Sequence, residues 1–271
     1  MDSAAILNLP YAKRRLIVVT DTPVEETVER HISRWHRIVL KSPTLVAVPF
    51  VAAGVVSKDI FRAKRMRERG TDVLPVSLSA AQTLRFPPGH ARNNVLYVGH
   101  PVDRGSYIPS AEFHRFLFEH KVAEAMQLIR SLGARKVTVR SVKGWSREAA
   151  LNMGLSLPNE IGGANATSTA DVGKSASSSH EIVTTMTLEP TQEPTVPSDL
   201  VWMPHEPLWR EVARARLESG LQEFSIDVRS TDDFGVNASL RALIEKVGFD
   251  AGGRFVEHVE TIWRLDGSFS S

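Results

Sequence analysis

The side chains best suited to bind a small ligand lie in two loops that follow short apolar runs. One loop follows the run 16–19 and the other follows the run 95–98. If these runs are adjacent parallel strands, both loops lie at the carboxyl edge of one sheet, where open α/β sheets bind ligands. We expect a candidate site for a nucleotide-like small molecule there. Its residues are Asp21, His100, Asp103 and Arg104.

No complete catalytic motif accompanies these residues. The chain lacks the dinucleotide-binding pattern Gly-x-Gly-x-x-Gly, the Walker phosphate loop and the Gly-x-Ser-x-Gly nucleophile elbow. Gly99 and Gly105 are too sparse to cradle a phosphate with backbone amides. The sequence therefore predicts no catalytic residues and no cofactor. An enzymatic function is the alternative hypothesis rather than the leading one.

A basic helix is predicted over residues 57–70. Five cations fall within eight residues, beside apolar Ile60, Phe61 and Met66. A basic amphipathic helix can lie on an anionic membrane or contact phosphates, and a solvated helix face or a partner for the acidic second half explains the same residues. The candidate anion- or membrane-binding residues are Arg62, Lys64, Arg65, Arg67 and Arg69.

The sequence gives little support for a metal site or for thiol chemistry. The chain has no cysteine, which excludes disulfides, thiolate zinc sites and a cysteine nucleophile. His114 and His120 are six residues apart, so they lie on different faces of one helix. Asp232 and Asn237 precede a helical pattern and are expected to cap it. We predict no metal site.

The elements that carry these side chains alternate between apolar runs and helical patterns. Strand–helix–strand order favours an α/β or α+β fold with a mixed, partly parallel sheet covered by helices. Up to residue 142, the predicted strands are 16–19, 45–51, 73–78, 95–98 and 136–142, and the predicted helices are 22–39, 57–70 and 110–132.

A Ser/Ala/Gly-rich segment at 154–179 separates this region from the last third of the chain. It is either a flexible linker or the polar tip of a hairpin between strands 136–142 and 181–188. The linker reading gives a basic α/β portion 1–153, a linker 154–180 and an acidic α+β portion 181–271. The hairpin reading joins them into one domain. Helices at 207–219 and 236–247, strands at 224–228 and 255–265, and packing anchors Trp202 and Trp209 complete the last third.

Charge is divided unevenly along the chain. Residues 1–150 hold 24 Lys and Arg against 13 Asp and Glu, whereas the remainder holds 9 against 18. This asymmetry favours an anionic partner for the basic half, or attraction between the two halves within one copy or between copies. No secretory signal or apolar run of spanning length is present, so a cytoplasmic protein is expected, with peripheral membrane association as an open alternative.

The leading functional hypothesis is a non-enzymatic self-assembling or effector protein with a basic surface for a membrane or another anionic partner. Its sharper form is a pore-former that releases a β-hairpin from segment 154–179, although the apolar residues of that segment are mostly alanine. The alternative is an α/β enzyme that acts on a nucleotide-like small molecule. Nucleic acid is the least favoured partner, because aromatic residues do not alternate with the basic cluster.

Overall fold

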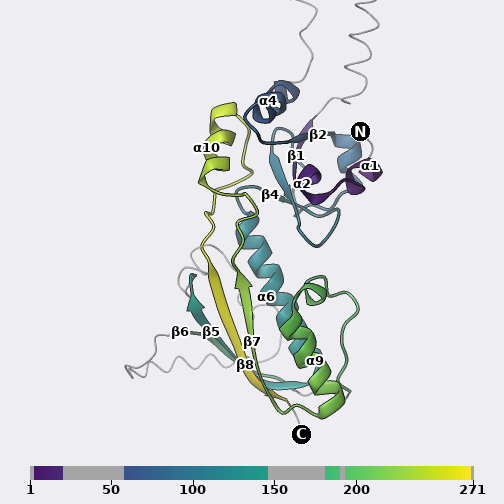
Figure 1. The fold of residues 1–271 in the computed structure, drawn as a ribbon, viewed down its shortest axis with the longest axis vertical. Coiled ribbons are helices and arrows are strands. Elements are labelled where there is room, and N and C mark those ends of the chain that lie inside the picture. Colours follow the sequence, from purple (N-terminus) through teal and green to yellow (C-terminus); the bar gives the residue numbers. More distant parts are fainter. Residues whose placement is uncertain (1–2, 21–57, 146–180, 190–192, 270–271) are drawn as a thin grey trace, which may run out of the picture. The chain divides into compact units, whose positions relative to one another are not determined.

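The computed structural model describes residues 3–20, 58–145, 181–189 and 193–269. These residues form an α+β fold with two four-stranded sheets (Figure 1). The chain divides into two compact units. Unit 1 comprises residues 1–113 and 235–257, and unit 2 comprises residues 114–234 and 258–271.

Unit 1 contains a mixed sheet with the strand order β2-β1-β3-β4. Strand β1 runs parallel to β2 and antiparallel to β3, and β3 runs antiparallel to β4. The partly parallel sheet expected from the sequence is therefore present, with one parallel pair. The strands are β1 (Leu16–Thr20), β2 (Leu74–Ser77), β3 (Leu96–Gly99) and β4 (Tyr107–Pro109).

The core of unit 1 forms around β1, whose five residues are all buried. Ile17 and Val19 pack with Val76 of β2, Tyr97 of β3 and Tyr107 of β4. A continuous apolar run is typical of a strand with both faces covered. The described helices of this unit are α1 (Ser3–Leu7), α2 (Tyr11–Arg14), α4 (Lys58–Arg67), α5 (Leu78–Ala81) and α10 (Ala238–Val247).

Backbone hydrogen bonds attach the segment that follows α10 to the sheet of unit 1. The Asp250 carbonyl accepts from the Leu96 amide at 2.9 Å, and the Asp250 amide donates to the Asn94 carbonyl at 3.0 Å. The Ala111 amide donates to the Ala251 carbonyl at 2.9 Å. Residues more than 130 positions apart therefore belong to one folded unit.

Unit 2 contains an antiparallel sheet with the strand order β6-β5-β8-β7. Its strands are β5 (Ala134–Lys143), β6 (Glu181–Thr187), β7 (Glu223–Ser230) and β8 (Thr261–Phe269). Two long helices, α6 (Phe113–Ser131) and α9 (Pro207–Ser219), lie along the sheet (Figure 1), and the short 3₁₀ helix η1 (Met203–His205) precedes α9.

One face of the unit 2 sheet forms its core. Val137 and Val139 of β5 and Leu265 of β8 are fully buried. Phe118 of α6 packs edge-on against Trp263 of β8, with ring centroids 5.0 Å apart. The alternation of buried and more exposed residues along these strands is typical of an antiparallel sheet with one solvated face.

Several sequence predictions can be compared directly with the structure. The helices at 57–70, 110–132, 207–219 and 236–247 are confirmed as α4, α6, α9 and α10, and Trp202 and Trp209 are buried. The helix at 22–39, the strand at 45–51 and segment 154–179 lie outside the described residues.

The last strand was predicted wrongly to begin at residue 255. Strand β8 begins at Thr261. The Val256 amide instead donates to the Ala111 carbonyl at 2.7 Å, and Arg241 lies over the ring of Phe255. These contacts hold residues 255 and 256 in unit 1, so an alternating pattern that the sequence presents as one strand is divided between two units.

The two compact units divide the chain at other places than the composition-based portions 1–153, 154–180 and 181–271, for which a single domain joining the first and last portions was the alternative. Strands β5 and β6, which flank segment 154–180, pair antiparallel within unit 2. Residues 235–257, from the acidic portion, belong to unit 1. Composition reports local charge, whereas the units are defined by pairings between distant segments.

Candidate interaction and ligand-binding sites

The loop after β3 is held together by its own polar side chains. The amides of Val102 and Asp103 donate to Nδ1 of His100, at 3.3 and 2.9 Å. Asp103 accepts a hydrogen bond from Ser106 Oγ at 2.5 Å and forms an ion pair with Arg85. The predicted ligand-binding residues His100 and Asp103 therefore contribute contacts that shape this loop, while Arg104 is exposed.

The topology removes the reason for grouping Asp21 with this loop. The grouping requires parallel strands, but β1 and β3 are antiparallel, with Leu16 opposite Val98. Antiparallel strands bring the end of β3 beside the start of β1, and the Gly99 amide donates to the Arg15 carbonyl at 2.7 Å. Asp21 follows the other end of β1 and lies outside the described residues.

The five predicted cations of α4 and its C-terminal turn have different environments. Arg62 is half-buried, hydrogen-bonds to Asn94 and lies over the ring of Phe249, so it holds the helix in unit 1. Lys64 lies 4.0 Å from Glu68, and Arg67 lies 3.5 Å from Asp72.

Arg65 and Arg69 are exposed, and neither side chain has a hydrogen bond or ion pair with another described residue. The exposed basic surface therefore consists of Lys64, Arg65, Arg67 and Arg69, without Arg62. Among the described helices, none is long and apolar enough to cross a membrane.

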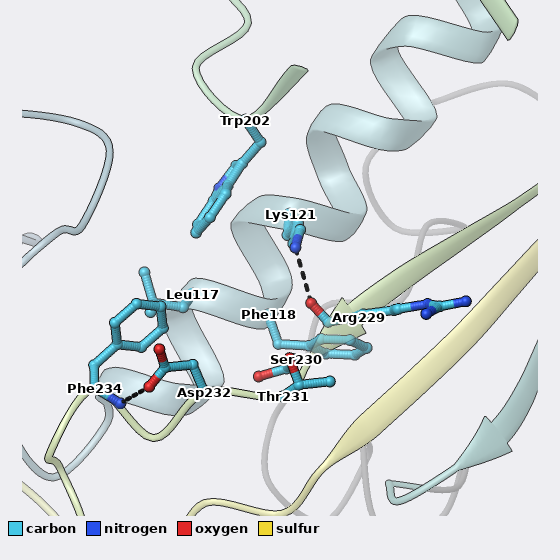
Figure 2. Close-up of a pocket in the computed structure, with 9 residues that line it drawn as sticks. All are labelled: Leu117, Phe118, Lys121, Trp202, Arg229, Ser230, Thr231, Asp232 and Phe234. Carbon is cyan, nitrogen blue, oxygen red and sulfur yellow. Dashed lines mark hydrogen bonds between the residues drawn. The ribbon is translucent and has the colours of Figure 1, made fainter. Parts of the chain in front are cut away.

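A small pocket opens in unit 2 beside the end of β7 (Figure 2). The rings of Phe118, Trp202 and Phe234 line it together with Lys121 and Asp232. Its volume is about 80 Å³, well below the roughly 300–1,000 Å³ of pockets that enclose drug-sized ligands. The pocket has room for a few waters or a small side chain rather than for a nucleotide.

Lys121 is the cation of this pocket, and its ammonium group is already engaged. It donates to the Arg229 carbonyl at 2.9 Å (Figure 2), forms a 2.5 Å ion pair with Glu206 and lies 4.9 Å from the ring of Trp202. These contacts connect α6 to β7 and to the start of α9. The geometry gives Lys121 a positioning role within unit 2.

Glu124, one turn further along α6, is a second buried anchor that the sequence does not reveal. It is 4 % exposed, and its carboxylate accepts the amides of Val201, Trp202 and Met203 at 2.6–2.8 Å. A carboxylate at the amino end of a 3₁₀ turn satisfies amides that would otherwise lack partners. Glu124 therefore fixes Trp202 at the pocket.

The solvated face of the unit 2 sheet carries a network of ion pairs. Nε of Arg264 on β8 donates to Asp227 on β7 at 2.8 Å, and Arg229 contacts the same carboxylate at 2.8 Å. Arg140 on β5 lies 3.4 Å from Asp266 on β8. The hydrogen bond from Arg264, followed by that from Arg229, holds the pKa of Asp227 below its ordinary value of 3.8.

The two edges of this sheet differ. On β7, Trp209 Nε1 donates to the Asp227 carbonyl at 3.3 Å and Lys121 donates to the Arg229 carbonyl, so helical side chains occupy two edge carbonyls. Among the described strands, β6 has β5 as its one neighbour, and residues 182–187 (IVTTMT) contain neither charge nor proline. Ile182 is 50 % exposed.

In the described parts of the chain, no group of three His, Asp or Glu side chains converges to form a metal site. Asn237 caps α10, because its side-chain oxygen accepts the amides of Ser239 and Leu240. Asp232 accepts the amide of Phe234 at 2.6 Å. Asn237 is therefore the helix cap expected from the sequence, whereas Asp232 closes a turn before the helix and does not cap it.

No protein-family model matches the chain, and neither the curated proteins nor the solved structures contain a significant match. Function is therefore inferred from the geometry of the chain itself.

Proposed function

We propose that this protein acts by self-association rather than by catalysis, and that β6 is the strand through which two copies pair. The observation that carries the proposal is the composition of this edge strand. Edge strands of monomeric proteins are usually protected by charges, proline, bulges or covering elements, because their free backbone groups recruit other strands. Residues 182–187 have neither charge nor proline and consist largely of β-branched residues.

The opposite edge provides an internal comparison. Strand β7 contains Glu223, Asp227 and Arg229, and side chains of α6 and α9 occupy two of its carbonyls. One edge thus has the usual protection. Among the described residues the other has less, namely Glu181 at its start and an irregularity in its pairing with β5 at Val183. This difference favours pairing of β6 with β6 of a second copy over head-to-tail addition to β7.

Antiparallel pairing of two β6 strands is symmetric about a two-fold axis. It joins two four-stranded sheets into one of about eight strands and leaves the two protected β7 edges outermost. Such an interface closes on itself, because each copy uses the same edge. The product is a dimer rather than a filament.

The exposed basic surface of α4 supplies the second part of the proposal, a contact with an anionic partner such as a membrane surface. Lys64, Arg65, Arg67 and Arg69 are exposed on one short segment, and each cation near an anionic surface contributes about 1 kcal/mol. Dimerisation doubles the number of such segments per particle. Release of a pore-forming hairpin remains a hypothesis, because segment 154–179 lies outside the described residues.

Sedimentation and light scattering of the full chain test the pairing of β6. We expect a mass of twice 30.0 kDa for the wild type, and a dissociation constant at least tenfold weaker for Thr185→Lys. This change brings two like charges together across the two-fold axis.

The matched control is Glu223→Gln, which alters net charge by the same one unit on the other edge strand, and it should leave the dimer intact. A wild type that is monomeric at all concentrations, or a Thr185→Lys variant that associates as tightly as the control, would contradict the proposal.

A further inference from the structure

Arg14 is a buried cation whose hydrogen-bonding capacity the described chain does not use. It is the last residue of α2 and is 3 % exposed. Its Nε and Nη1 are buried, and neither atom has a hydrogen-bond partner among the described residues. A guanidinium removed from water with unmatched N–H groups loses the desolvation free energy of each group, so charged side chains are rarely buried unless paired.

The aromatic neighbours of Arg14 leave Nε and Nη1 without an acceptor, although Tyr107 interacts with the Arg14 side chain as well as with its carbonyl. The ring of Tyr11 lies 5.3 Å from the guanidinium carbon and offers a cation–π contact with one face of the group. The Tyr107 hydroxyl donates to the backbone carbonyl of Arg14 at 3.1 Å. These contacts orient the residue, while the two N–H directions at Nε and Nη1 stay unmatched.

Glycine at position 99 keeps the backbone close to the guanidinium. A Cβ atom at this position would lie 3.5 Å from Nη1 of Arg14 and 3.2 Å from the ring of Tyr107. A side chain here would therefore contact Nη1 of Arg14 and crowd the ring of Tyr107. This is the arrangement expected where a backbone and a cation approach a small ligand together.

The surrounding charge favours an anion. Lys13 and Arg15 flank Arg14 in the sequence, and unit 1 as a whole holds 19 Lys and Arg against 13 Asp and Glu. Within the described ranges no carboxylate pairs with Arg14. A positive unit with an uncompensated buried guanidinium attracts compact anions.

We propose that Arg14 is the cationic centre of a site for a compact anionic group, a phosphate or a carboxylate, beside Gly99 at the end of the unit 1 sheet. A guanidinium carries five N–H donors, and the unmatched Nη1 offers two of them to the oxygens of such a group, while Nε–H offers a further donor on another edge of the planar group. The site is independent of β6 pairing.

Entry to the site requires a movement of Tyr11. Its hydroxyl donates to the Gly99 carbonyl at 3.1 Å and closes the position over Arg14. Rotation of the Tyr11 side chain breaks this hydrogen bond and leaves Arg14 in place, because its carbonyl stays bonded to the Tyr107 hydroxyl. The bound anion replaces the contact that Tyr11 loses.

Thermal unfolding of the full chain, with sodium phosphate or sodium acetate compared with sodium chloride at equal ionic strength, tests the proposal. At about one hundred times the dissociation constant, binding raises the melting temperature by the order of 5 °C. The phosphate and acetate arms distinguish the two anion classes. Adenosine monophosphate compared with adenosine then tests whether a nucleotide can supply the phosphate.

Arg14→Met is the decisive variant, and Arg65→Met, which removes an exposed arginine of the same unit, is its control. We expect Arg14→Met to abolish the anion-dependent rise and, without anion, to melt at or above the wild-type temperature, because replacing an unpaired buried charge removes its desolvation cost. A purely structural arginine would instead lower the melting temperature in every salt.

Gly99→Ala keeps the cation and narrows the site, so it decides the question if Arg14→Met does not fold. We expect it to weaken the calorimetric affinity for inorganic phosphate or acetate at least fivefold. No rise for the wild type in either anion, an equal rise in Arg14→Met, or an unchanged affinity in Gly99→Ala would each overturn the proposal.

Discussion

Asp227 lies at the centre of the ion-pair network on the solvated face of unit 2. Its carboxylate is 11 % exposed and contacts both Arg264 and Arg229. Because its pKa is lower in the folded chain than its ordinary value of 3.8, the ionised form stabilises the folded state. That contribution is fully present above the ordinary pKa and is lost as the pH falls through the lower, folded-state pKa.

Asp227→Asn should lower the free energy of unfolding by about 1 kcal/mol at neutral pH, since both arginine partners are partly exposed and solvent screens them. The difference from the wild type should disappear at strongly acidic pH. Urea unfolding at a series of pH values between about 5 and 2 measures it. Glu223→Gln, an exposed change on the same strand, should follow the wild-type curve, and an Asp227→Asn variant that keeps the full acid sensitivity would refute this account.

At the scale of elements, two glycines with left-handed backbones differ in how much room a side chain would have. Gly144 follows β5 at φ +82°, and Gly220 ends α9 at φ +64°. A Cβ on Gly144 would lie 2.8 Å from Cα of Thr261 and closer still to the Glu260 carbonyl, whereas a Cβ on Gly220 would meet nothing within 4 Å. Position 144 therefore requires glycine both for its positive φ and for lack of space, whereas position 220 requires it for its positive φ alone.

Gly220→Ala should cost about 1 kcal/mol of stability, the penalty for placing a side chain in the left-handed region. Gly144→Ala should cost about 3 kcal/mol, because the start of β8 must also move. Chemical denaturation of both variants measures the difference. Equal losses would show that the contact between residue 144 and the start of β8 is less tight than described.

The sheet edges belong to the same scale. Strand β7 is protected by side chains that come from α6 and α9, so its protection depends on helices that are distant in sequence. The feature that marks strand β6 lies in the strand itself, because residues 182–187 carry no charge, and this is visible in the sequence. Only the sheet order identifies that uncharged run as an edge.

At the scale of the molecule, the two units retain part of the charge asymmetry of the chain. Unit 1 holds 19 Lys and Arg against 13 Asp and Glu, and unit 2 holds 14 against 18. The contrast is weaker than between residues 1–150 and the rest, because basic segments such as 135–143 belong to unit 2. The charge division thus runs between folded units whose segments interleave along the chain.

A fragment that ends at residue 153 should therefore not fold as a domain. It lacks α10 and the segment whose Asp250 and Ala251 hydrogen-bond to residues 94, 96 and 111. We expect no cooperative thermal transition for fragment 1–153 by circular dichroism, and recovery of one when fragment 154–271 is co-expressed. A cooperative transition of fragment 1–153 alone would restore the two-domain reading based on composition.

The sequence by itself determined the local elements of this protein. The buried run at β1, the four described long helices and the Asn237 cap follow from the spacing of apolar residues and from side chains that satisfy nearby backbone groups. The burial of Trp202 and Trp209 was also predicted from position and residue type. These features depend on contacts between residues that are close in the sequence, so the types and spacing of neighbouring residues predict them.

The tertiary structure alone decided how the elements combine. The antiparallel direction of β1 and β3 removed the basis for grouping Asp21 with the His100 loop, and the backbone hydrogen bonds of Asp250 attach the segment after α10 to unit 1. The burial of Arg14, within a basic run that looks solvated in the sequence, likewise depends on the packing around it. Strand direction and the burial of a charge depend on contacts with distant segments, so local composition does not predict them.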